Sequence, residues 1–562
     1  MSGQTGADLF VEALADYGVD RVFGNPGTTE LPVMEALGES DLEYVLGLHE
    51  DIAVGMAAGY ASTRRYHRHH DPDVNPVGVV NLHIAPGLAH GLGNLYGAMM
   101  TGAPLVVTAG NHETDFRHEE PILGGDLVGM AEPFTKWSEE VLAVDALPTM
   151  LRRAFRVALT PPTGPVFLAL PLDVMMAETD DDPEPIGPIP TAGRGDPAQI
   201  EAAADLLVEA EEPVMVLGDH VAHADGVEAA VALAEASGAR VHAEMLAYEV
   251  GFPGEHDQWV SHIPPVEAMA QPLLDTDTIA FVGCSTNTTT TYHEGPLVPD
   301  DAECVHVGHD AWQVAKNYPA DAAVLGDPGE VMAEIAERVE DRLDGVERDA
   351  RLERVSEFKA LVEERMATMG EGNDDPRASK AQLVDAMRAA APDANIVDEG
   401  ITSKYVMLAR WPFRPEQYIG NKGGGLGYGL PASIGAAIAE DQLGEEGGQA
   451  RDVIGYIGDG SYLYYPHALY TAARYDVDLA VVIPDNRNYR ILKDNTLSIL
   501  GGEEADHEFL GMDFEPPVDI PANVESHGAT GRLVDDPAEI QSAVEEAVAA
   551  DGPVVLDVLV HD

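Results

Sequence analysis

The sequence is poor in cysteine and in long apolar runs. Its 562 residues include only two cysteines, so we expect no disulfide framework and a reducing compartment. No run approaches the about 18–20 apolar residues that a membrane-spanning helix needs. The first residues, MSGQTGADLF, lack the basic and apolar regions of a secretory signal. These absences predict a cytoplasmic protein that does not enter the membrane.

Positive charge is scarce as well. Asp and Glu number 98 against 32 Lys and Arg, of which only seven are lysine, and the formal net charge is −66. Such a surface repels nucleic acid and anionic membranes, so neither is an expected partner. Because 45% of the residues are apolar, we expect a folded chain and not acidic disorder. The acidic shell indicates a halophilic source, since salt screens its self-repulsion.

Two segments without apolar periodicity, 177–199 and 366–379, divide the chain. The predicted domains are 1–178, 195–345 and 379–562. Each alternates short apolar runs with helical periodicity, which is typical of parallel sheets covered on both faces. The predicted fold class is therefore α/β, with three doubly wound parallel-sheet domains.

Two loops in the third domain carry the strongest chemical signal. A predicted strand over 453–457 leads into Gly458-Asp459-Gly460, and another over 479–483 leads into Asp485-Asn486-Arg487-Asn488. Because parallel strands end at the same edge of a sheet, Asp459 and Asn486 could reach one point. A carboxylate, an amide oxygen and a loop carbonyl suit Mg²⁺ held together with phosphates. Taken singly, each segment could be only a turn.

The stretch GDGSYLYYPHALYTAARYDVDLAVVIPDN (458–486) resembles the motif of thiamine diphosphate-dependent enzymes, a GDG followed further along by an Asn pair. Asp485 replaces the first Asn of that pair. The resemblance implies thiamine diphosphate and Mg²⁺ as cofactors. It implies that Asp459 and Asn486 bind the metal by their side chains and Asn488 by its carbonyl. The residues implied to contact the cofactor are Gly424, Leu426, Gly458, Gly460 and Ser461.

The segment GLHEDIAVGMAAGYAS (47–62) places Glu50 at a predicted strand-to-helix junction. Glu50 resembles the family's glutamate, whose protonated carboxyl donates a hydrogen bond to the aminopyrimidine ring. Without that resemblance, a glutamate here is explained by the favourable interaction of a negative charge with a helix N-terminus.

Within the family, VFGNPGTTELP (22–32) and the segment 79–111, which contains NLHIAPGLAH, most resemble the benzoylformate decarboxylases. The resemblance implies that His83 shuttles a proton and that Asn25 and Thr28 contact the substrate. His293 lies near the position of a second substrate-pocket histidine, although Thr291 is the match without a gap.

The implied reaction is non-oxidative decarboxylation of a benzoylformate-like 2-oxo acid to an aldehyde. The alternatives are an acetolactate synthase-like carboligase and a non-catalytic protein that retains the fold. The resemblance places Glu50 and Asp459 on different subunits, which predicts a homodimer or homotetramer. Two smaller expectations concern single residues: His67, His69 and His70 should lie in a solvated loop, and Cys284 and Cys304 should be core residues.

Overall fold

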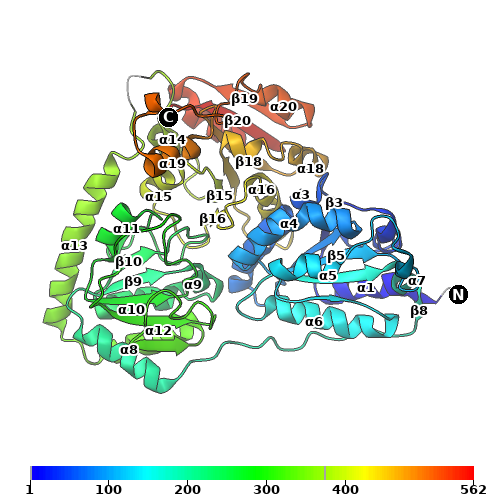
Figure 1. Cartoon of the computed structure of the whole chain (residues 1–562), viewed down its shortest axis with the longest axis horizontal. Coiled ribbons are helices and arrows are strands. Elements are labelled where there is room, and N and C mark those ends of the chain that lie inside the picture. Colours follow the sequence, from blue (N-terminus) through cyan, green and yellow to red (C-terminus); the bar gives the residue numbers. More distant parts are fainter. Residues whose placement is uncertain (1–2, 373–374) are drawn as a thin grey trace.

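The computed structural model describes residues 3–372 and 375–562, and these residues form three six-stranded parallel sheets. Figure 1 shows the three α/β domains, with the first in blue and cyan, the middle one in green and the third in yellow to red. The predicted fold class is confirmed. Within the described residues, no helix is long and apolar enough to cross a bilayer.

The first sheet has the strand order β3-β2-β4-β5-β7-β6. Its central strands β4 and β5 are buried along their whole length, which explains their nearly continuous apolar sequences. The strands are β2 (Arg21–Gly24), β3 (Glu43–Leu46), β4 (Gly78–Leu82), β5 (Leu105–Asn111), β6 (Ser138–Glu140) and β7 (Val166–Pro171). The helices are α1 (Gly6–Asp16), α2 (Leu31–Gly38), α3 (Glu50–His70), α4 (Ile84–Thr101), α5 (Leu127–Ala131), α6 (Leu147–Leu159) and α7 (Leu172–Met176).

The middle sheet has the strand order β11-β10-β9-β12-β13-β14, and both cysteines are buried in this domain, as predicted. The strands are β9 (Val214–Leu217), β10 (Arg240–Ala243), β11 (Trp259–His262), β12 (Thr278–Val282), β13 (Glu303–Gly308) and β14 (Ala322–Leu325). The helices are α8 (Pro197–Glu209), α9 (Asp219–His223), α10 (Val227–Ser237), α11 (Glu267–Leu274), α12 (Pro328–Glu340) and α13 (Gly345–Ala367).

The third sheet has the strand order β16-β15-β17-β18-β20-β19, so β17 and β18 are the neighbours that the sequence predicts. The strands are β15 (Asn395–Glu399), β16 (Tyr418–Gly420), β17 (Val453–Ile457), β18 (Leu479–Asp485), β19 (Thr530–Val534) and β20 (Pro553–Leu559). The helices are α14 (Lys380–Ala390), α15 (Lys404–Arg410), α16 (Gly429–Glu445), α17 (Asp459–Tyr462), α18 (Ala468–Arg474), α19 (Arg490–Leu500), α20 (Ile520–Ser526) and α21 (Ile540–Val548).

The two predicted linkers are only partly irregular. Segment 177–199 contains β8 (Glu178–Thr179), which pairs antiparallel with β1 (Gln4–Thr5), and it ends in the first turn of α8. Segment 366–379 begins in the last turn of α13, and its residues 373 and 374 lie outside the described residues. The domain bounds stay a prediction.

Each sheet contains a central point at which strand addition changes direction. These points lie between β2 and β4, between β9 and β12, and between β15 and β17. In doubly wound sheets such a point opens a crevice at the carboxyl ends of the two strands, where ligands bind. The fold therefore offers three crevices, one in each domain.

The first and third domains meet where α3 packs against α16. The two helices approach so closely that a Cβ at Gly59 would lie 2.7 Å from Cα of Ala432. Only glycine fits at that position, because any larger residue would overlap the opposing backbone. This contact fixes the start of α3, and with it Glu50, relative to the third domain.

The prediction of a solvated histidine loop is wrong. Helix α3 continues to His70, and His67 is buried. Glu416 of the third domain contacts both His69 Nδ1, at 3.1 Å, and His70 Nε2, at 2.9 Å. The middle domain contributes Asp225, 3.8 Å from His69 Nδ1. Packing of three domains around the end of α3 orders a segment that its polar sequence assigns to solvent.

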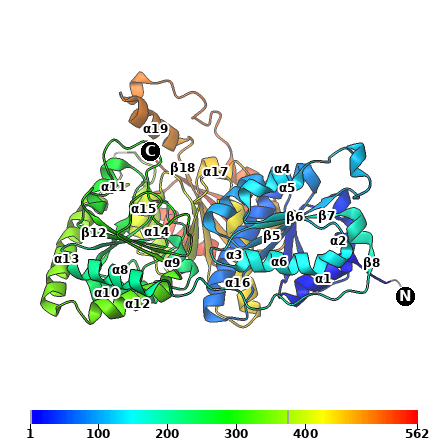
Figure 2. The same cartoon turned by 60° about the horizontal axis from the view of Figure 1, so that its bottom comes forward.

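Helix α19 projects from the body of the third domain, as Figure 2 shows. None of its residues is buried, and Leu492, Ile499 and Leu500 are exposed. The helix follows directly on the Asp485-Asn486-Arg487-Asn488 loop, so its first turn begins next to the predicted metal site.

Candidate functional site

The two predicted metal-binding loops of the third domain are in direct contact. Asp459 begins α17, immediately after β17, and its Oδ2 accepts the backbone N–H of Arg487 at 2.7 Å. In the second loop, Asn486 Oδ1 accepts the N–H of Asn488 at 3.3 Å. The structure therefore brings Asp459, Asn486 and Asn488 to one edge of the sheet.

This edge holds more carboxyl groups than the motif requires. Burial and the facing Asp485 carboxyl raise the pKa of Asp459 to about 8. Burial, followed by Asp485, also raises the pKa of Asp557 to about 7. Among the described residues no Lys, Arg or His forms an ion pair with Asp459, and Asn488 Oδ1 is buried without a partner. Carboxylates together with a free amide oxygen suit Mg²⁺, whose binding would displace the protons.

A glutamate that the sequence analysis missed shapes the neighbouring glycine loop. Glu399 ends β15 and is buried. Its carboxylate accepts Asn421 Nδ2 at 2.8 Å and the N–H groups of Tyr428 at 3.3 Å and Gly429 at 2.8 Å. Burial raises the pKa of Glu399 to about 7. An acidic residue at the end of the apolar run NIVDE was the available signal, and it marks the β15–β17 crevice.

The glycine loop itself is open to solvent. Gly424 and Gly425 are exposed and Leu426 is partly buried. Gly424 has φ +70°, a conformation that favours glycine, and its N–H donates to Asn421 Oδ1 at 3.0 Å. Gly460 and Ser461 are buried beside Asp459, and Gly458 is partly buried. The predicted cofactor residues thus lie on the two loops that flank the end of β15.

In the first domain, Glu50 and His83 share one crevice. Glu50 is the first residue of α3, and His83 follows β4 at the β2–β4 crevice. A Cβ at Gly87 would lie 2.9 Å from Glu50 Oε1 and 3.1 Å from His83 Cβ. The two side chains therefore lie on either side of a glycine that leaves room for both.

His83 is held by a second glutamate that the sequence analysis missed. The ring nitrogen Nδ1 of His83 lies 2.9 Å from Glu30 Oε2. Glu30 is buried and also accepts the N–H groups of Gly27 at 3.0 Å, Ile84 at 3.3 Å and Gly110 at 2.8 Å. With Nδ1 donating to the carboxylate, Nε2 is the ring nitrogen left free. Glu30 stands two residues after Thr28, within the segment 22–32 that the sequence analysis had already singled out. That position was the available signal.

The residue after His83 has a strained backbone. Ile84 has φ +32°, which a β-branched residue rarely adopts. The N–H of Ile84 donates to Glu30 Oε1 at 3.3 Å, and the carbonyl of His83 accepts the N–H of Gly87 at 2.7 Å. These bonds hold the strained turn that presents His83, and strain of this kind is common at functional sites.

The predicted substrate residues are only partly brought together. Asn25 and Thr28 lie on the loop after β2, on the other side of the crevice from His83. His293 lies on the loop after β12 in the middle domain, and its Nδ1 contacts the carbonyl of Gly295 at 2.8 Å. Among the described residues no hydrogen bond or ion pair joins His293 to Asn25, Thr28 or His83, so its role stays a prediction.

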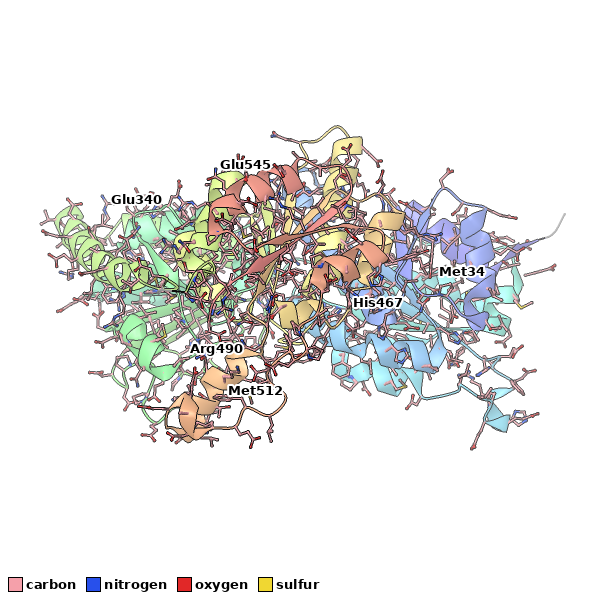
Figure 3. The ribbon with its side chains drawn as sticks, turned by 90° about the horizontal axis from the view of Figure 1, so that it is seen from above. Met34, Glu340, His467, Arg490, Met512 and Glu545 are labelled. Atoms are coloured by element: carbon pink, nitrogen blue, oxygen red, sulfur yellow. The ribbon has the colours of Figure 1, made fainter. Side chains whose placement is uncertain are left out.

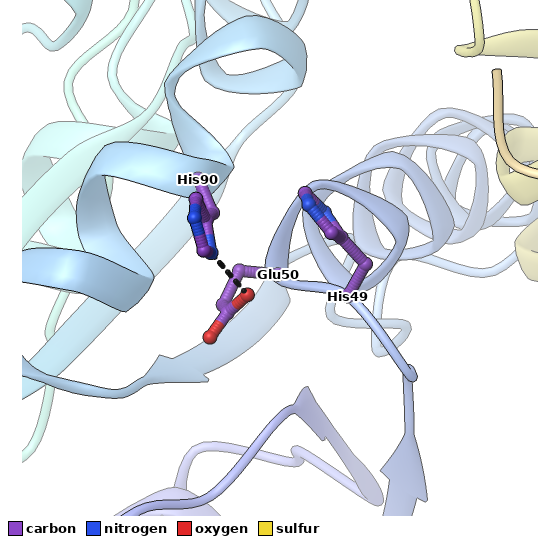
Figure 4. Close-up of side chains that lie close together, drawn as sticks. All are labelled: His49, Glu50 and His90. Atoms are coloured by element: carbon purple, nitrogen blue, oxygen red, sulfur yellow. Dashed lines mark hydrogen bonds and ion pairs between the residues drawn. The ribbon is translucent and has the colours of Figure 1, made fainter.

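Two histidines lie close to the Glu50 carboxylate. In Figure 4 the His90 ring lies next to the carboxylate, with Nδ1 at 3.2 Å from Glu50 Oε2, and the His49 ring is stacked against the His90 ring. The third domain reaches the same place, because Tyr465 donates to Asp51 at 3.0 Å and His467 contacts the His49 ring. In Figure 3 His467 lies at the boundary between these domains. Within the described residues, no hydrogen bond or ion pair joins Glu50 to Asp459.

The crevice of the middle domain is completed by the chain itself. Glu244 follows β10 and accepts the N–H groups of Ser285 at 2.7 Å and Thr286 at 2.6 Å. Lys422, from the glycine loop of the third domain, forms buried ion pairs with Asp219 and Glu244. The strand ends that could receive a ligand here bind side chains instead.

Sequence comparisons match three successive parts of the chain to one family. The N-terminal TPP binding domain of thiamine pyrophosphate enzymes matches residues 4–134, the central domain matches 200–335 and the C-terminal TPP binding domain matches 398–558. A benzoylformate decarboxylase of Pseudomonas aeruginosa is 32% identical over 97% of both chains. A probable acetolactate synthase large subunit of Methanocaldococcus jannaschii is 26% identical over 99% of this chain and 92% of its own.

Solved structures give the same result. The thiamine diphosphate-dependent 4-hydroxybenzoylformate decarboxylase of Rhodococcus jostii RHA1 superimposes with a TM-score of 0.83 and 28% identity, and 99% of each chain is covered. Sequence and fold therefore agree along nearly the whole chain, including the weakly patterned middle domain.

Proposed function

Because this chain belongs to the family of thiamine pyrophosphate-dependent enzymes, we propose that it decarboxylates a benzoylformate-like 2-oxo acid to an aldehyde without oxidation. The observation that carries the proposal is the meeting of Asp459, Asn486 and Asn488 at one sheet edge, with a Glu50–His83 crevice in the domain that the family uses for the other half of the site. The substrate class follows from what the similar proteins are named for.

The third domain would hold the cofactor through Mg²⁺. Asp459 and Asn486 would bind the metal by their side chains and Asn488 by its carbonyl, with Gly458, Gly460 and Ser461 next to the diphosphate. When bound, thiamine diphosphate supplies the nucleophilic carbon and the electron sink for loss of CO₂. Leu426 and Gly424, on the exposed glycine loop, would contact its central part.

Glu50 and His83 would handle the protons. Glu50, at the start of α3, would donate a hydrogen bond from its carboxyl to the aminopyrimidine ring of the bound cofactor. His83 takes and returns a proton at Nε2, because Glu30 binds Nδ1 and fixes which nitrogen is free. Asn25 and Thr28, across the crevice, would bind the substrate carboxylate, and His293 would approach from the middle domain.

A second copy of the chain would complete the site. The first domain exposes Leu48, two residues before Glu50, and Tyr96, Met99 and Met100 on α4, the helix that also carries His90. Apolar side chains gathered at one face of a charged protein favour burial against a partner. In a homodimer, or a homotetramer built from it, Glu50 of one subunit would face the Asp459 loop of the other.

Carboligation of the acetolactate synthase kind is the second candidate, since an acetolactate synthase is similar over 99% of this chain. The middle crevice favours the decarboxylase, because Lys422 and Glu244 fill the strand ends where the flavin expected for a synthase-like enzyme could bind.

The test is a panel of 2-oxo acids given to the full chain with thiamine diphosphate, Mg²⁺ and high KCl. CO₂ and aldehyde are measured together, for benzoylformate, 4-hydroxybenzoylformate and pyruvate. We expect equal amounts of CO₂ and aldehyde from an aromatic acid, and a loss of turnover of about 10²–10⁴-fold in Glu50→Gln, the range for a general acid. CO₂ without aldehyde, accompanied by a hydroxyketone, would favour the carboligase. A chain inactive on every acid, or a fully active Glu50→Gln variant, contradicts the proposal.

A further inference from the structure

We infer that His49, Glu50 and His90 form a binding site for a divalent transition metal such as Zn²⁺, separate from the Mg²⁺ site, and that metal bound there excludes the cofactor. One nitrogen or oxygen atom from each of the three residues lies within 4.8 Å of the others. Figure 4 shows both imidazoles on the same side of the carboxylate. The site was not apparent in the sequence, because His90 is 40 residues from Glu50.

Contacts among the three residues, and one with the backbone of Asp51, hold them close together. His90 lies on α4, and its Nδ1 is 3.2 Å from Glu50 Oε2. His49 caps α3, and its Nδ1 accepts the N–H of Asp51 at 3.1 Å. The two rings are stacked, with centroids 5.0 Å apart. A metal therefore meets a set of ligands that is already assembled and not one that must be gathered.

The ligand types select the metal. Two imidazoles and one carboxylate suit Zn²⁺, Ni²⁺ or Cu²⁺, whereas Mg²⁺ prefers a site made only of oxygen atoms. Three protein ligands leave one position of tetrahedral Zn²⁺ for water. Metal binding through His49 Nε2 moves the ring proton to Nδ1. His49 then loses the hydrogen bond that Nδ1 accepts from the N–H of Asp51 and gains the bond to the metal.

The site is also reachable from solvent. The side chain of His90 is 59% exposed, while that of Glu50 is only 9% exposed. Metal would enter from the His90 side and bind the inner carboxylate last. This is the face at which the proposed function places the aminopyrimidine ring.

Competition with the cofactor rests on the proposed function. A carboxylate bound to Zn²⁺ has no proton to donate, and the metal fills the space beside it. Zn²⁺ is therefore expected to weaken thiamine diphosphate binding, while Mg²⁺, held by the third domain, strengthens it.

The first experiment measures the metal alone. The full chain, freed of metal by a chelator, is titrated with ZnCl₂ by calorimetry, and with Co²⁺ as a visible probe. We expect one zinc per chain to be lost, or bound at least about tenfold more weakly, in His90→Asn and in His49→Asn. His70→Asn, at the other end of α3 beside Glu416, is the matched control and should keep that zinc. Identical titrations of the wild type and His90→Asn would overturn the site.

The second experiment separates the site from the proposed role of Glu50. The dissociation constant of thiamine diphosphate is measured by calorimetry in excess Mg²⁺, with and without ZnCl₂. We expect Zn²⁺ to raise it at least about tenfold in the wild type and to have little effect in His90→Asn. If the wild type binds the extra zinc but keeps its affinity for thiamine diphosphate, competition is refuted, and with it the placement of the aminopyrimidine at Glu50.

Discussion

The crevices of the middle and third domains have the same topology but differ in whether a cationic side chain pairs with their buried carboxylates. Both lie where strand addition reverses, and both bury carboxylates: Asp219 and Glu244 in the middle domain, Asp459 and Asp485 in the third. In the middle domain the buried Lys422 forms an ion pair with each of the two carboxylates. In the third domain Asp485 Oδ2 lies 3.6 Å from Nε of the half-exposed Arg487, but within the described residues no cationic side chain forms an ion pair with Asp459. The topology of a doubly wound sheet therefore provides a crevice in each domain. A crevice can bind a metal or ligand only where the buried carboxylates are not already paired with a cationic side chain of the same chain.

The largest effect is expected from Asp459→Ala. Removing the carboxylate that links the two loops should abolish Mg²⁺ binding, cofactor retention and activity. Retention is measured as thiamine diphosphate per chain after gel filtration. Asp485→Asn is the control, because it removes the facing charge and restores the family's Asn pair, and it should retain the cofactor. An Asp459→Ala protein that remains saturated would show that the third crevice is completed in another way.

The matching change in the middle domain is Lys422→Met. It leaves Asp219 and Glu244 buried without a cation, and loss of one partner of a buried ion pair costs about 3–5 kcal/mol. Unfolding in urea should show that loss of stability. Lys493→Met removes a pair with the more exposed Asp513 and should change stability by about 0–1 kcal/mol. Equal losses of stability in Lys422→Met and Lys493→Met would show that Lys422 is no more important for stability than an exposed ion pair.

Glu30→Gln tests whether Glu30 holds His83 in its orientation in the first crevice. The amide cannot accept from both His83 and the backbone N–H groups as the carboxylate does, so the ring loses its fixed orientation. We expect turnover to fall by about 10–100-fold, the usual cost of losing an orienting partner, with a shifted pH profile and little change in KM. Glu43→Gln, on the exposed end of β3, is the control. An unshifted pH profile would reduce Glu30 to a structural role.

The last expected effect is the pH dependence of the stability of the metal-free protein. Asp459, with its pKa near 8, and Asp557, with its pKa near 7, stay protonated in the folded chain at pH values where the unfolded chain has released both protons. Stability should therefore fall as the pH rises from about 4 to about 8. Melting temperatures in EDTA at pH 5 and pH 8 measure this, and Mg²⁺ or Asp459→Asn should reduce the difference. No difference between the two pH values would mean that the carboxylates are not forced together.

Much of the fold could be predicted because its signal is local. Continuous apolar strands such as VIGYI over 453–457 lie where the sequence places them, since a strand buried on both faces has to be apolar along its length. The histidines at the end of α3 show the limit of this reasoning. Their sequence is polar throughout, and contacts with Glu416, Asp225 and Glu440 from the other two domains hold them in place.

The sequence by itself determined the three parallel sheets, the family and the two loops of the predicted metal site, because each depends on residues close together in the chain. Only the tertiary structure decided which charges meet. Lys422 pairs with Asp219 across 203 residues, and Glu30 reaches His83 across 53. Such pairs depend on how the domains pack against one another, and the local pattern of apolar residues carries no information about contacts between distant parts of the chain.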